Sequence, residues 1–428
     1  MMPRRSRRSG RGSRATAERE DASPRADDAA PADEAARADE AAPADGTLLA
    51  AISRFTRSQY RLRRGNEVRV LRGGAETFPP MLAAIAAARA SVLLETYILE
   101  DDRAGRRFID AVIARARAGC TVRVMYDAVG SFGLAGAQVE RMRDAGAQVI
   151  EYHPVAPWRA RWNLSHRNHR KILVVDDEVA FTGGLNLSDD YAAIADGGRG
   201  WHDVHCELRG PIVADLARIF RRAWLAQGGP PYPAPPPATA VAPRPASIVA
   251  RVVDNTHRKR RGAIRRAYLT AINAARTSVL VENAYFLPAR PVRQALARAV
   301  ARGVDVAVIV PGQSDVKTVE YAGLYIYRKL AAQGVRILRW RGPMMHAKTA
   351  VVDGLWTAIG SYNFDARSLR YNLEVIVEIV DAEVGAEMEA DFRGDEAACE
   401  PFDVADWTSL AWWRKALAWL AYRLRDWL

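Results

Sequence analysis

Apolar and polar positions follow a regular rhythm through the middle of the chain. Short apolar runs alternate with longer segments of helical spacing, which predicts strands alternating with helices. In the first half the pattern predicts strands over residues 69–72, 91–98, 121–126 and 148–152, and helices over 79–90, 105–118 and 137–145. Gly119 and Gly146 directly follow two of these helices, and a strand is expected shortly after each. Glycine at the end of a helix, followed by a strand, is typical of a mostly parallel sheet with flanking helices.

The second half repeats this order. Residues 271–282, Ala-Ile-Asn-Ala-Ala-Arg-Thr-Ser-Val-Leu-Val-Glu, match residues 84–95, Ala-Ile-Ala-Ala-Ala-Arg-Ala-Ser-Val-Leu-Leu-Glu, position by position. Helices that end near Gly303 and Gly334 then lead to strands expected over 304–310 and 335–338. Self-similarity over so long a period indicates duplication of one unit. The predicted fold class is therefore α/β, with two duplicated domains, each a mostly parallel mixed sheet flanked by helices.

The composition divides the chain into five segments. Residues 1–48 hold almost no large apolar residue, and such a segment cannot bury enough surface to offset its ordering entropy, so we expect disorder. The two α/β domains are expected over residues 49–227 and 248–402. A proline-rich linker over 228–247 should be stiff and extended. Residues 403–428 are expected to form an amphipathic helix.

Charge and cysteine content narrow the class of partner. The 428 residues carry a formal net charge of +12 at pH 7, which favours anionic partners, either nucleic acid or a membrane that contains anionic lipid. The three cysteines are unclustered and indicate neither a disulfide framework nor a zinc site. The chain has no apolar stretch of about 18 or more residues, so we expect no membrane-spanning helix.

One pattern of polar residues occurs twice at the same spacing. Each copy has a histidine, a lysine two positions later, an aspartate five positions after that, and then a Gly/Ser-x-Asn segment. The copies are His169, Lys171, Asp176, Gly184 and Asn186, and His346, Lys348, Asp353, Ser361 and Asn363. An apolar run follows each lysine and predicts a buried strand. Because side chains alternate along a strand, the histidine and lysine of each copy should point the same way.

This set of side chains suits phosphodiester exchange. The reaction needs a nucleophile, a proton donor for the leaving alkoxide, and cations for the phosphoryl oxygens. Two copies brought face to face supply two imidazoles and two ammonium groups, with Asn186 and Asn363 as neutral donors. Lys171 and Lys348, taken as permanent cations, supply the charge that Mg²⁺ would otherwise carry, so we expect no metal and no cofactor. No carboxylate cluster suited to a metal is evident near either copy.

The repeated pattern resembles the H-x-K-x4-D signature of the phospholipase D superfamily. The resemblance covers about residues 58–400, and the stretches 94–98, 182–186, 361–365 and 372–374 are similar to bacterial cardiolipin synthases of the short type without N-terminal spanning helices. It implies two phospholipase D-like domains with one composite active site at their interface. It also implies transfer of a phosphatidyl group from phosphatidylglycerol to the hydroxyl of a second lipid through a phosphohistidine.

The resemblance also implies roles for individual residues. His169 is expected to attack phosphorus, and His346 to act as general acid and base. Glu374 and Asp203 stand where the family tends to place the acid behind each histidine, although an ordinary surface role is the alternative for Asp203. The other positions of the pattern are expected to be structural, at Asp176 and Asp353, or to lie in loops near the phosphate, at Gly184 and Ser361.

Other classes of enzyme fit the same residues. A phospholipase D, or a phosphatidyltransferase with another acceptor such as one that makes phosphatidylserine, would use this chemistry. A nuclease would suit the positive charge, but superfamily nucleases are often single-motif dimers and a tryptophan-rich tail does not suit one. Nucleic acid is therefore not the expected partner. We expect anionic phospholipids, chiefly phosphatidylglycerol, and a membrane surface, with the protein peripheral at the cytoplasmic face of the bacterial inner membrane.

Two segments are candidates for contact with a membrane. The tail has an apolar stripe at 3-4-3-4-3 spacing, formed by Leu410, Trp413, Leu417, Leu420, Leu424 and Trp427. Such a helix, expected over residues 407–428, either lies in the membrane interface or docks on its own protein. The run from Arg159 to Arg170, which includes Arg167, is expected to form a basic rim for a lipid headgroup. His166 in this run is not expected to be catalytic.

Overall fold

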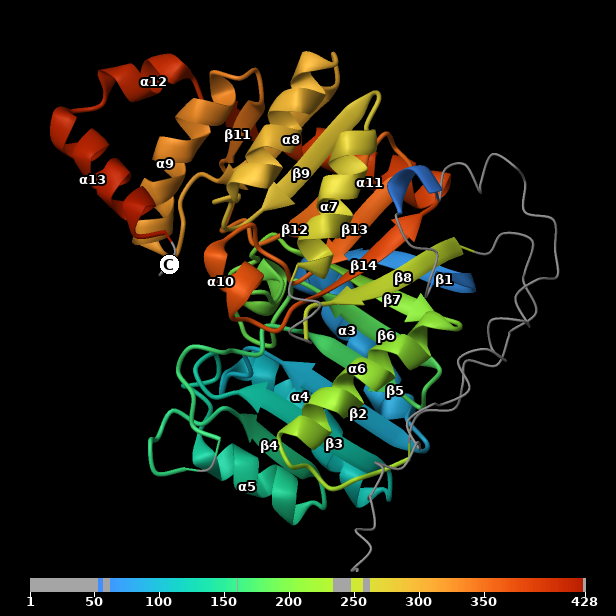
Figure 1. Ribbon diagram of the computed structural model, residues 1–428. Coiled ribbons are helices and arrows are strands. Elements are labelled where there is room, and N and C mark those ends of the chain that lie inside the picture. The colour runs from blue at the N-terminus through green and yellow to red at the C-terminus, as the bar shows by residue number, and fades with distance from the viewer. Residues whose placement is uncertain (1–52, 57–61, 160, 234–247, 257–261, 426–428) are drawn as a thin grey trace, which may run out of the picture. The chain divides into compact units, whose positions relative to one another are not determined.

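One sheet of fifteen strands runs through the described part of the chain, which in this computed structural model comprises residues 53–56, 62–159, 161–233, 248–256 and 262–425 (Figure 1). The predicted disordered tail, most of the proline-rich linker and the last three residues lie outside these ranges. In chain order the strands are β1 (Arg63–Arg72), β2 (Ser91–Thr96), β3 (Thr121–Asp127), β4 (Gln148–Tyr152), β5 (Ile172–Val175), β6 (Val179–Gly183), β7 (Val204–Arg209), β8 (Ile248–Asp254), β9 (Ser278–Asn283), β10 (Asp305–Pro311), β11 (Arg336–Trp340), β12 (Lys348–Val352), β13 (Trp356–Gly360), β14 (Val375–Val380) and β15 (Cys399–Pro401).

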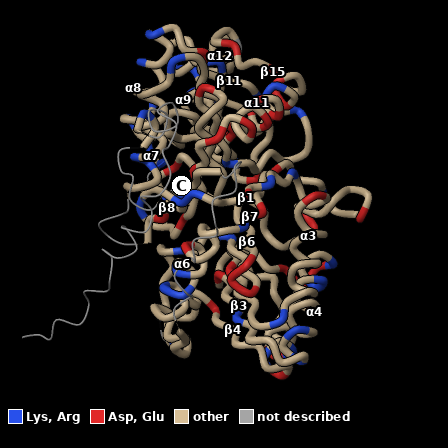
Figure 2. Tube along the Cα trace, turned by 90° about the vertical axis from the view of Figure 1, so that its right-hand side faces the viewer, with Lys and Arg blue, Asp and Glu red and all other residues tan. Residues whose placement is uncertain are grey.

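Helices cover both faces of this sheet. They are α3 (Gly73–Ala87), α4 (Arg103–Arg117), α5 (Gly136–Asp144), α6 (Ile212–Ala226), α7 (Ala263–Ala274), α8 (Arg290–Ala301), α9 (Lys317–Ala331), α10 (Ala366–Arg370), α11 (Ala382–Ala397), α12 (Val404–Ser409) and α13 (Trp412–Arg423). Figure 2 shows the strands between α6, α7, α8 and α9 on one side and α3, α4 and α11 on the other. Every helix within the described ranges is too short or too polar to cross a bilayer.

The duplication predicted from the sequence is confirmed. The first half has the strand order β4-β3-β2-β5-β6-β7-β1, and the second half has β11-β10-β9-β12-β13-β14-β8, so the two orders match strand by strand. Antiparallel pairing of β1 with β8, at Arg63 with Ala250 and at Asn66 with Ile248, joins the halves into a single sheet. The α/β fold class is therefore correct, and the two predicted domains share one sheet.

The expectation of a mostly parallel sheet is wrong. Parallel pairing joins β2, β3 and β4 in the first half and β9, β10 and β11 in the second. All other pairings among the described strands are antiparallel. The reason is that β5 and β12 each turn back directly into the next strand, and a hairpin needs no crossover helix. The helix–strand rhythm therefore describes only the first part of each half.

Tertiary contacts extend two elements beyond their predicted limits. β1 begins at Arg63, earlier than predicted, because it pairs with β7 on one edge and with β8 on the other. α3 begins at Gly73 although two prolines lie inside it, where sequence rules favour a helix boundary. The N–H groups of Gly73 and Gly74 donate to the carbonyl oxygens of Asp203 and Tyr191, which holds the first turn of α3 in place.

Both motif copies lie at the same kind of position, where parallel strands end. β2, β3 and β4 are parallel and β5 is antiparallel to β2, so β5 begins at the edge where the other three end. His169 and Lys171 directly precede β5. In the second half, His346 and Lys348 stand at the start of β12, beside the ends of β9 and β10. We call this the site edge of the sheet, because ligand sites commonly form at the carboxyl ends of parallel strands.

Candidate active site

The segment before β5 reaches across to the second half of the chain. The N–H of His169 donates to the carbonyl oxygen of Leu373 at 3.0 Å, which sets the His169 ring beside Glu374. Nδ1 of His169 lies 3.0 Å from Oε2 of Glu374 and 3.1 Å from the carbonyl oxygen of Ser361. Both neighbours only accept, so we assign the hydrogen to Nδ1 and a lone pair to Nε2.

Glu374 is buried and surrounded by donors. Its oxygens accept from the hydroxyl groups of Ser361 and Ser368 and from the side-chain amide of Asn372. Burial by itself would raise the pKa of Glu374, but His169 and these donors outweigh it and lower the pKa below its usual value. The carboxylate therefore stays ionised behind the His169 ring.

His346 is set in a matching arrangement by the first half. Its N–H donates to the carbonyl oxygen of His202 at 2.6 Å. Nδ1 of His346 lies 2.7 Å from Oδ2 of Asp203 and 3.2 Å from the hydroxyl of Tyr191. Nζ of Lys348 also lies 2.7 Å from this Nδ1, and burial raises the pKa of Asp203. When Asp203 is ionised it can only accept, so Nδ1–H then donates to Asp203 and Nε2 carries the lone pair.

The two acids are exchanged between the halves. Glu374, from the second half, contacts His169 of the first half, and Asp203, from the first half, contacts His346 of the second. Sequence order left this pairing open, because each acid follows the histidine of its own half. Neither half holds a complete histidine–acid pair by itself, so the arrangement is one composite site.

Both lysines are buried beside their histidines. Nζ of Lys171 donates to the carbonyl oxygen of His169 at 2.8 Å, and Lys348 donates to the carbonyl oxygen of His346. Burial lowers the pKa of Lys171 to about 7 and the pKa of Lys348 to about 8. Each lysine therefore titrates much closer to neutral pH than an exposed lysine, and an anion bound beside it would favour the ammonium form.

The pKa values of both candidate histidines are lowered. Burial is the main cause at each site, and the nearby lysine charges act in the same direction, while Glu374 opposes them at His169. Both imidazoles are therefore neutral at neutral pH. A phosphodiester bound between them would add negative charge, which raises the pKa of an imidazole.

Asn186 and Asn363 are both buried at the site edge but have different partners. Nδ2 of Asn186 donates to the hydroxyl of Tyr191 at 2.7 Å, and Tyr191 in turn contacts His346. Oδ1 of Asn363 has no hydrogen-bond partner within the described residues. We therefore expect Asn186 to position Tyr191, and Asn363 to offer a polar group to a ligand.

Gly184 and Ser361, predicted to lie near the phosphate, contact the two acids. A Cβ at Gly184 would lie 2.0 Å from Oδ1 of Asp203, so glycine leaves the room that this carboxylate occupies. The N–H of Gly184 donates to Val204 and that of Ser361 to Val375. Since both N–H groups are already used, we expect these residues to position the acids and not to bind phosphate.

The aspartates that end the two motif copies make structural contacts away from the histidines. Asp176 accepts from the N–H groups of Arg89, Ala90 and Ser91. Asp353 accepts from the N–H groups of Arg276, Thr277 and Ser278. Each aspartate therefore ties its hairpin turn to the junction between a helix and the strand that follows it.

The predicted basic rim is wrong at its C-terminal end. Arg167 and Arg170 are 1% and 0% exposed. Arg167 pairs with Asp127 at 3.4 Å, and Arg170 pairs with Glu95 at 2.7 Å. Buried charges need such partners, and these two arginines therefore hold the His169 segment in place instead of meeting a headgroup. Arg159, by contrast, is exposed.

Three tyrosines around the histidines were not predicted from the sequence. The Tyr97 ring centre lies 4.9 Å from that of His169, and those of Tyr191 and Tyr285 lie 5.5 and 6.2 Å from that of His346. Burial raises the pKa of all three, that of Tyr97 to about 12, so their hydroxyl groups stay protonated. Tyr97 and Tyr285 each follow one of the two aligned strands, but they differ by one position, so the alignment places Ala284 opposite Tyr97.

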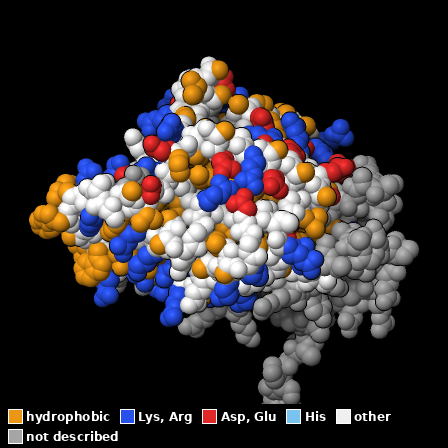
Figure 3. Space-filling model, turned by 90° about the horizontal axis from the view of Figure 1, so that it is seen from above, with side chains coloured by type: hydrophobic (Ala, Val, Ile, Leu, Met, Phe, Trp, Pro, Cys, Tyr) orange, Lys and Arg blue, Asp and Glu red, His pale blue; other side chains and the backbone are white. Residues whose placement is uncertain are grey.

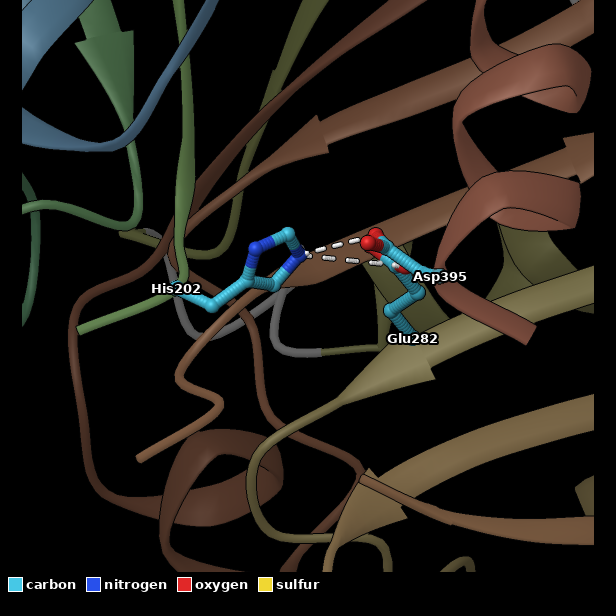
Figure 4. Close-up of side chains that lie close together, drawn as sticks. All are labelled: His202, Glu282 and Asp395. Atoms are coloured by element: carbon cyan, nitrogen blue, oxygen red, sulfur yellow. Dashed lines mark ion pairs between the residues drawn. The ribbon is translucent and has the colours of Figure 1, made fainter. Parts of the chain in front are cut away.

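A cluster of His202, Glu282 and Asp395 could hold a metal ion (Figure 4). Nε2 of His202 lies 3.0 Å from Oδ2 of Asp395 and 4.0 Å from Oε1 of Glu282. Burial lowers the pKa of His202, but the contact with Asp395 and the charge of Glu282 outweigh it and raise the pKa to about 9. A protonated imidazole therefore pairs with Asp395 and lowers the pKa of that carboxyl, while burial raises the pKa of Glu282 to about 8. This cluster was not predicted from the sequence, although His202 directly precedes Asp203.

Comparisons with known proteins agree with this arrangement. A family model described as "Cardiolipin synthase, PLD-like domain" matches residues 81–224 and 268–395. "Cardiolipin synthase A" of Pseudomonas aeruginosa is 35% identical over 361 residues, which cover 84% of this chain and 72% of the relative. "Cardiolipin synthase 2" of Bacillus cereus is 34% identical over 334 residues, which cover 77% and 64%. The crystal structure of phosphatidylserine synthase from Haemophilus influenzae has a TM-score of 0.67 at 14% identity, covers 88% of this chain and 97% of that one, and shows the same fold.

Proposed function

Because the chain belongs to the cardiolipin synthase family of phospholipase D-like proteins, we propose that its composite site transfers a phosphatidyl group from one phosphatidylglycerol to a hydroxyl of another. The products are cardiolipin and glycerol. The observation that carries this proposal is the exchange of acids between the halves, which gives one site two buried imidazoles, each with an acid behind it. Such a pair suits a two-step exchange, in which one ring bonds to phosphorus and the other moves protons.

In the first step, His169 is the nucleophile. Its Nε2 attacks the phosphorus of phosphatidylglycerol, a P–N bond forms, and the P–O bond to the glycerol headgroup breaks. His346, protonated once the anionic phosphate is bound, gives its proton to the leaving glycerol oxygen. Glu374 keeps the Nδ1–H of His169 in place and stabilises the positive charge that the ring gains.

In the second step, the phosphohistidine passes its phosphatidyl group to the acceptor. The hydroxyl of a second phosphatidylglycerol gives its proton to the now neutral His346 and attacks phosphorus. The P–N bond breaks, and His169 regains its lone pair. Water in place of the acceptor would give phosphatidic acid, so exclusion of water decides between transfer and hydrolysis.

Lys171, Lys348 and the Nδ2 donor of Asn363 are the groups that we assign to the phosphoryl oxygens, and Oδ1 of Asn363 is left to accept from a hydroxyl of the substrate. Burial, which lowers the pKa of both lysines, also lowers the local dielectric, so each contact to an anion is stronger than in water. Binding of the phosphodiester would be accompanied by proton uptake at the lysines. The developing charge at phosphorus would then meet two ammonium groups that are already in position.

His169 is favoured over His346 as the nucleophile by the partners of its Nδ1. Both neighbours of that atom accept, whereas Nδ1 of His346 also lies 2.7 Å from Nζ of Lys348. A single possible tautomer keeps the lone pair at Nε2, where attack occurs. A His346→Asn enzyme incubated with phosphate-labelled lipid should retain acid-labile label on His169. Label on His346 in a His169→Asn enzyme would reverse the roles.

We also assign the protein to the cytoplasmic face of the bacterial inner membrane, as a peripheral enzyme with anionic phospholipids as partners. Both proposed substrates are lipids, and the net charge of +12 favours an anionic surface. Cell fractionation should find the protein in the membrane pellet and release it with high salt. Protection from protease in inverted membrane vesicles would contradict the assigned face.

Thin-layer analysis of the lipids that purified protein makes from phosphatidylglycerol tests the reaction. We expect cardiolipin, with an equal amount of glycerol, and no product from His169→Ala. Phosphatidic acid as the main product would indicate a phospholipase D. A product that requires CDP-diacylglycerol and serine would indicate phosphatidylserine synthesis, and plasmid cleavage in a parallel assay would indicate a nuclease.

A further inference from the structure

Large apolar side chains are exposed in only two regions of the described chain. The first comprises Val129, Phe132, Trp158, Trp162, Leu164, Ile194 and Val316, and the second comprises Trp412, Trp413, Leu417, Trp419, Leu420 and Leu424. Phe132 and Trp158 are 83% and 86% exposed. Scattered apolar side chains are ordinary on a protein surface, but confinement to two regions indicates an interaction site.

The first region lies in loops at the site edge. Val129 and Phe132 follow β3, residues 158–164 join β4 to the His169 segment, Ile194 follows β6, and Val316 follows β10. β3, β4 and β10 end at the site edge, and β6 ends there as well because it is antiparallel to β5. The exposed apolar loops therefore lie at the same edge of the sheet as the composite site.

The second region is the outer face of α13. Ala418 is buried, and Tyr422 packs on Tyr325 of α9 with ring centres 4.8 Å apart. Trp413 and Leu420, on the apolar stripe predicted from the sequence, are 46% and 48% exposed. The predicted helix is broken between α12 and α13, and it docks on α9 with a face other than the stripe. Docking, one of the two alternatives posed from the sequence, therefore leaves the apolar stripe exposed.

The two regions lie on the same side of the described unit. α9 begins at Lys317, directly after Val316, so the helix that carries α13 starts from the site edge. Figure 1 shows α13 on the same side as α10 and the loops that follow β3 and β4. Figure 3, seen from above, shows hydrophobic and basic side chains together at the left, where Figure 1 has α12 and α13.

Basic side chains stand among the exposed aromatic rings of both regions. Arg159 and Arg161 lie between Trp158 and Trp162 in the loop after β4, and both are exposed. On α13, the guanidinium of Arg423 lies 5.7 Å from the centre of the Trp419 ring. Tryptophan sits at the headgroup level of a bilayer, and arginine beside it meets the lipid phosphates.

We propose that the site-edge loops and the outer face of α13 form one surface that lies on an anionic bilayer, with the site edge of the sheet turned toward the lipid. The proposal rests on the proposed function, which supplies the partner. A headgroup could then reach His169 and His346 while its acyl chains stay in the bilayer, so that little apolar surface of the lipid is exposed to water.

Co-sedimentation of the full-length chain with vesicles of phosphatidylglycerol and phosphatidylcholine tests this surface. A loop variant, Phe132→Ser with Trp158→Ser, and a helix variant, Leu417→Ser with Leu420→Ser, each remove two exposed apolar side chains. We expect each to lower the partition coefficient by at least about tenfold, because those side chains no longer leave water on binding. Serine at two exposed positions at the end of α4, Arg117→Ser with Ala118→Ser, is the matched control and should bind as the unaltered protein does.

Loss of binding in only one of the two variants would overturn the single surface, and normal binding in both would overturn the proposal entirely. Sedimentation velocity without lipid gives a further check, since a change of oligomeric state in either variant would mean that the region meets a second copy of the chain. His169→Ala separates this proposal from the proposed function. It should lose turnover but sediment with vesicles normally, so failure of the chemistry leaves the surface testable.

Discussion

The two halves of the chain secure matching buried glutamates in different ways. Glu95 and Glu282 occupy aligned positions on β2 and β9, and both are buried. In the first half, Arg170 pairs with Glu95 at 2.7 Å, and the side chain of Asn168 donates to it at 2.6 Å. The first half thus holds its glutamate with a guanidinium of its own.

The second half has no such cation at the aligned positions, which are Met345 and Ala347. Glu282 faces His202, which comes from the first half, and His202 also contacts Asp395. In both halves the glutamate anchors a segment that carries a candidate catalytic group: His169 beside Arg170, and Asp203 beside His202. The buried glutamate is therefore paired with a permanent cation, Arg170, in the first half and with a titratable one, His202, in the second.

The largest expected effect comes from the feature that the halves share, one histidine each. His169→Ala and His346→Ala should each lower kcat/KM by at least about a thousandfold, and the double variant should be no worse, because residues that act as a unit are not additive. His166→Ala, nearby but outside the composite site, is the control and should retain most turnover. Substantial activity in either single variant would show that one half works without the other.

The exchange of acids should produce the next largest effect. Glu374→Gln and Asp203→Asn keep the shape of each acid but can donate to Nδ1 and so favour the wrong tautomer, which should lower turnover by about a hundredfold or more. Nitrogen NMR of the imidazole rings reports the pairing directly. Glu374→Gln should shift the Nδ1 signal of His169 and Asp203→Asn that of His346. The opposite assignment would mean that each acid serves its own half.

What could be predicted from the sequence is what depends on local spacing. His169 and Lys171 lie two residues apart on one extended segment, and the repeat is visible as an aligned run. The acid pairs could not be predicted, because Asp203 and His346 are 143 residues apart and Glu374 and His169 are 205 apart. Which acid meets which histidine depends on the pairing of β1 with β8, to which no motif points.

Two of the predictions that the structure contradicts, on the basic rim and on the tail, fail because each depends on a distant contact. An arginine is normally exposed, so the sequence predicts Arg170 on a rim, whereas Glu95, 75 residues earlier, pairs with it in a buried site. The apolar period of the tail continues through residues 410–411, where the chain breaks between α12 and α13. Periodicity indicates which face is apolar, but the contact with α9 decides which face is buried.

The free energy of unfolding should distinguish the Arg170–Glu95 pair from the His202–Glu282 contact. Arg170→Met leaves Glu95 as a buried charge without its guanidinium, which should lower the free energy of unfolding by about 3–5 kcal/mol. Urea unfolding measures this. Arg159→Met, which removes an exposed partner of Glu151, is the control and should cost about 1 kcal/mol or less. If Arg170→Met unfolds at the same urea concentration as the unaltered protein, the pair is not an anchor.

Substitution of His202, in the cluster with Glu282 and Asp395, should lower the free energy of unfolding by a smaller and pH-dependent amount. The pKa of His202 is raised in the folded protein to about 9, so its contribution to stability is fully present below its usual pKa of about 6.5 and is lost as the pH rises through 9. His202→Gln should therefore cost about 1–3 kcal/mol at pH 6 and little at pH 10. Urea unfolding across this range checks the slope, and a constant difference would mean that His202 is neutral in the folded state.

Metal removal should have the smallest effect on turnover. It also distinguishes Arg170 from His202 as partners of the two buried glutamates. Arg170 cannot release its proton and so leaves no place for a cation beside Glu95, whereas His202 can exchange its proton for a metal. In the proposed reaction Lys171 and Lys348 stabilise the phosphoryl charge, so dialysis against EDTA should leave kcat/KM unchanged within about twofold. Turnover that is lost with EDTA and restored only by Mg²⁺ or Ca²⁺ would contradict this mechanism.

Thermal melting with added Zn²⁺ tests the cluster of His202, Glu282 and Asp395 separately. A rise in Tm of the unaltered protein that is absent in His202→Gln would show that the imidazole binds metal in place of its proton.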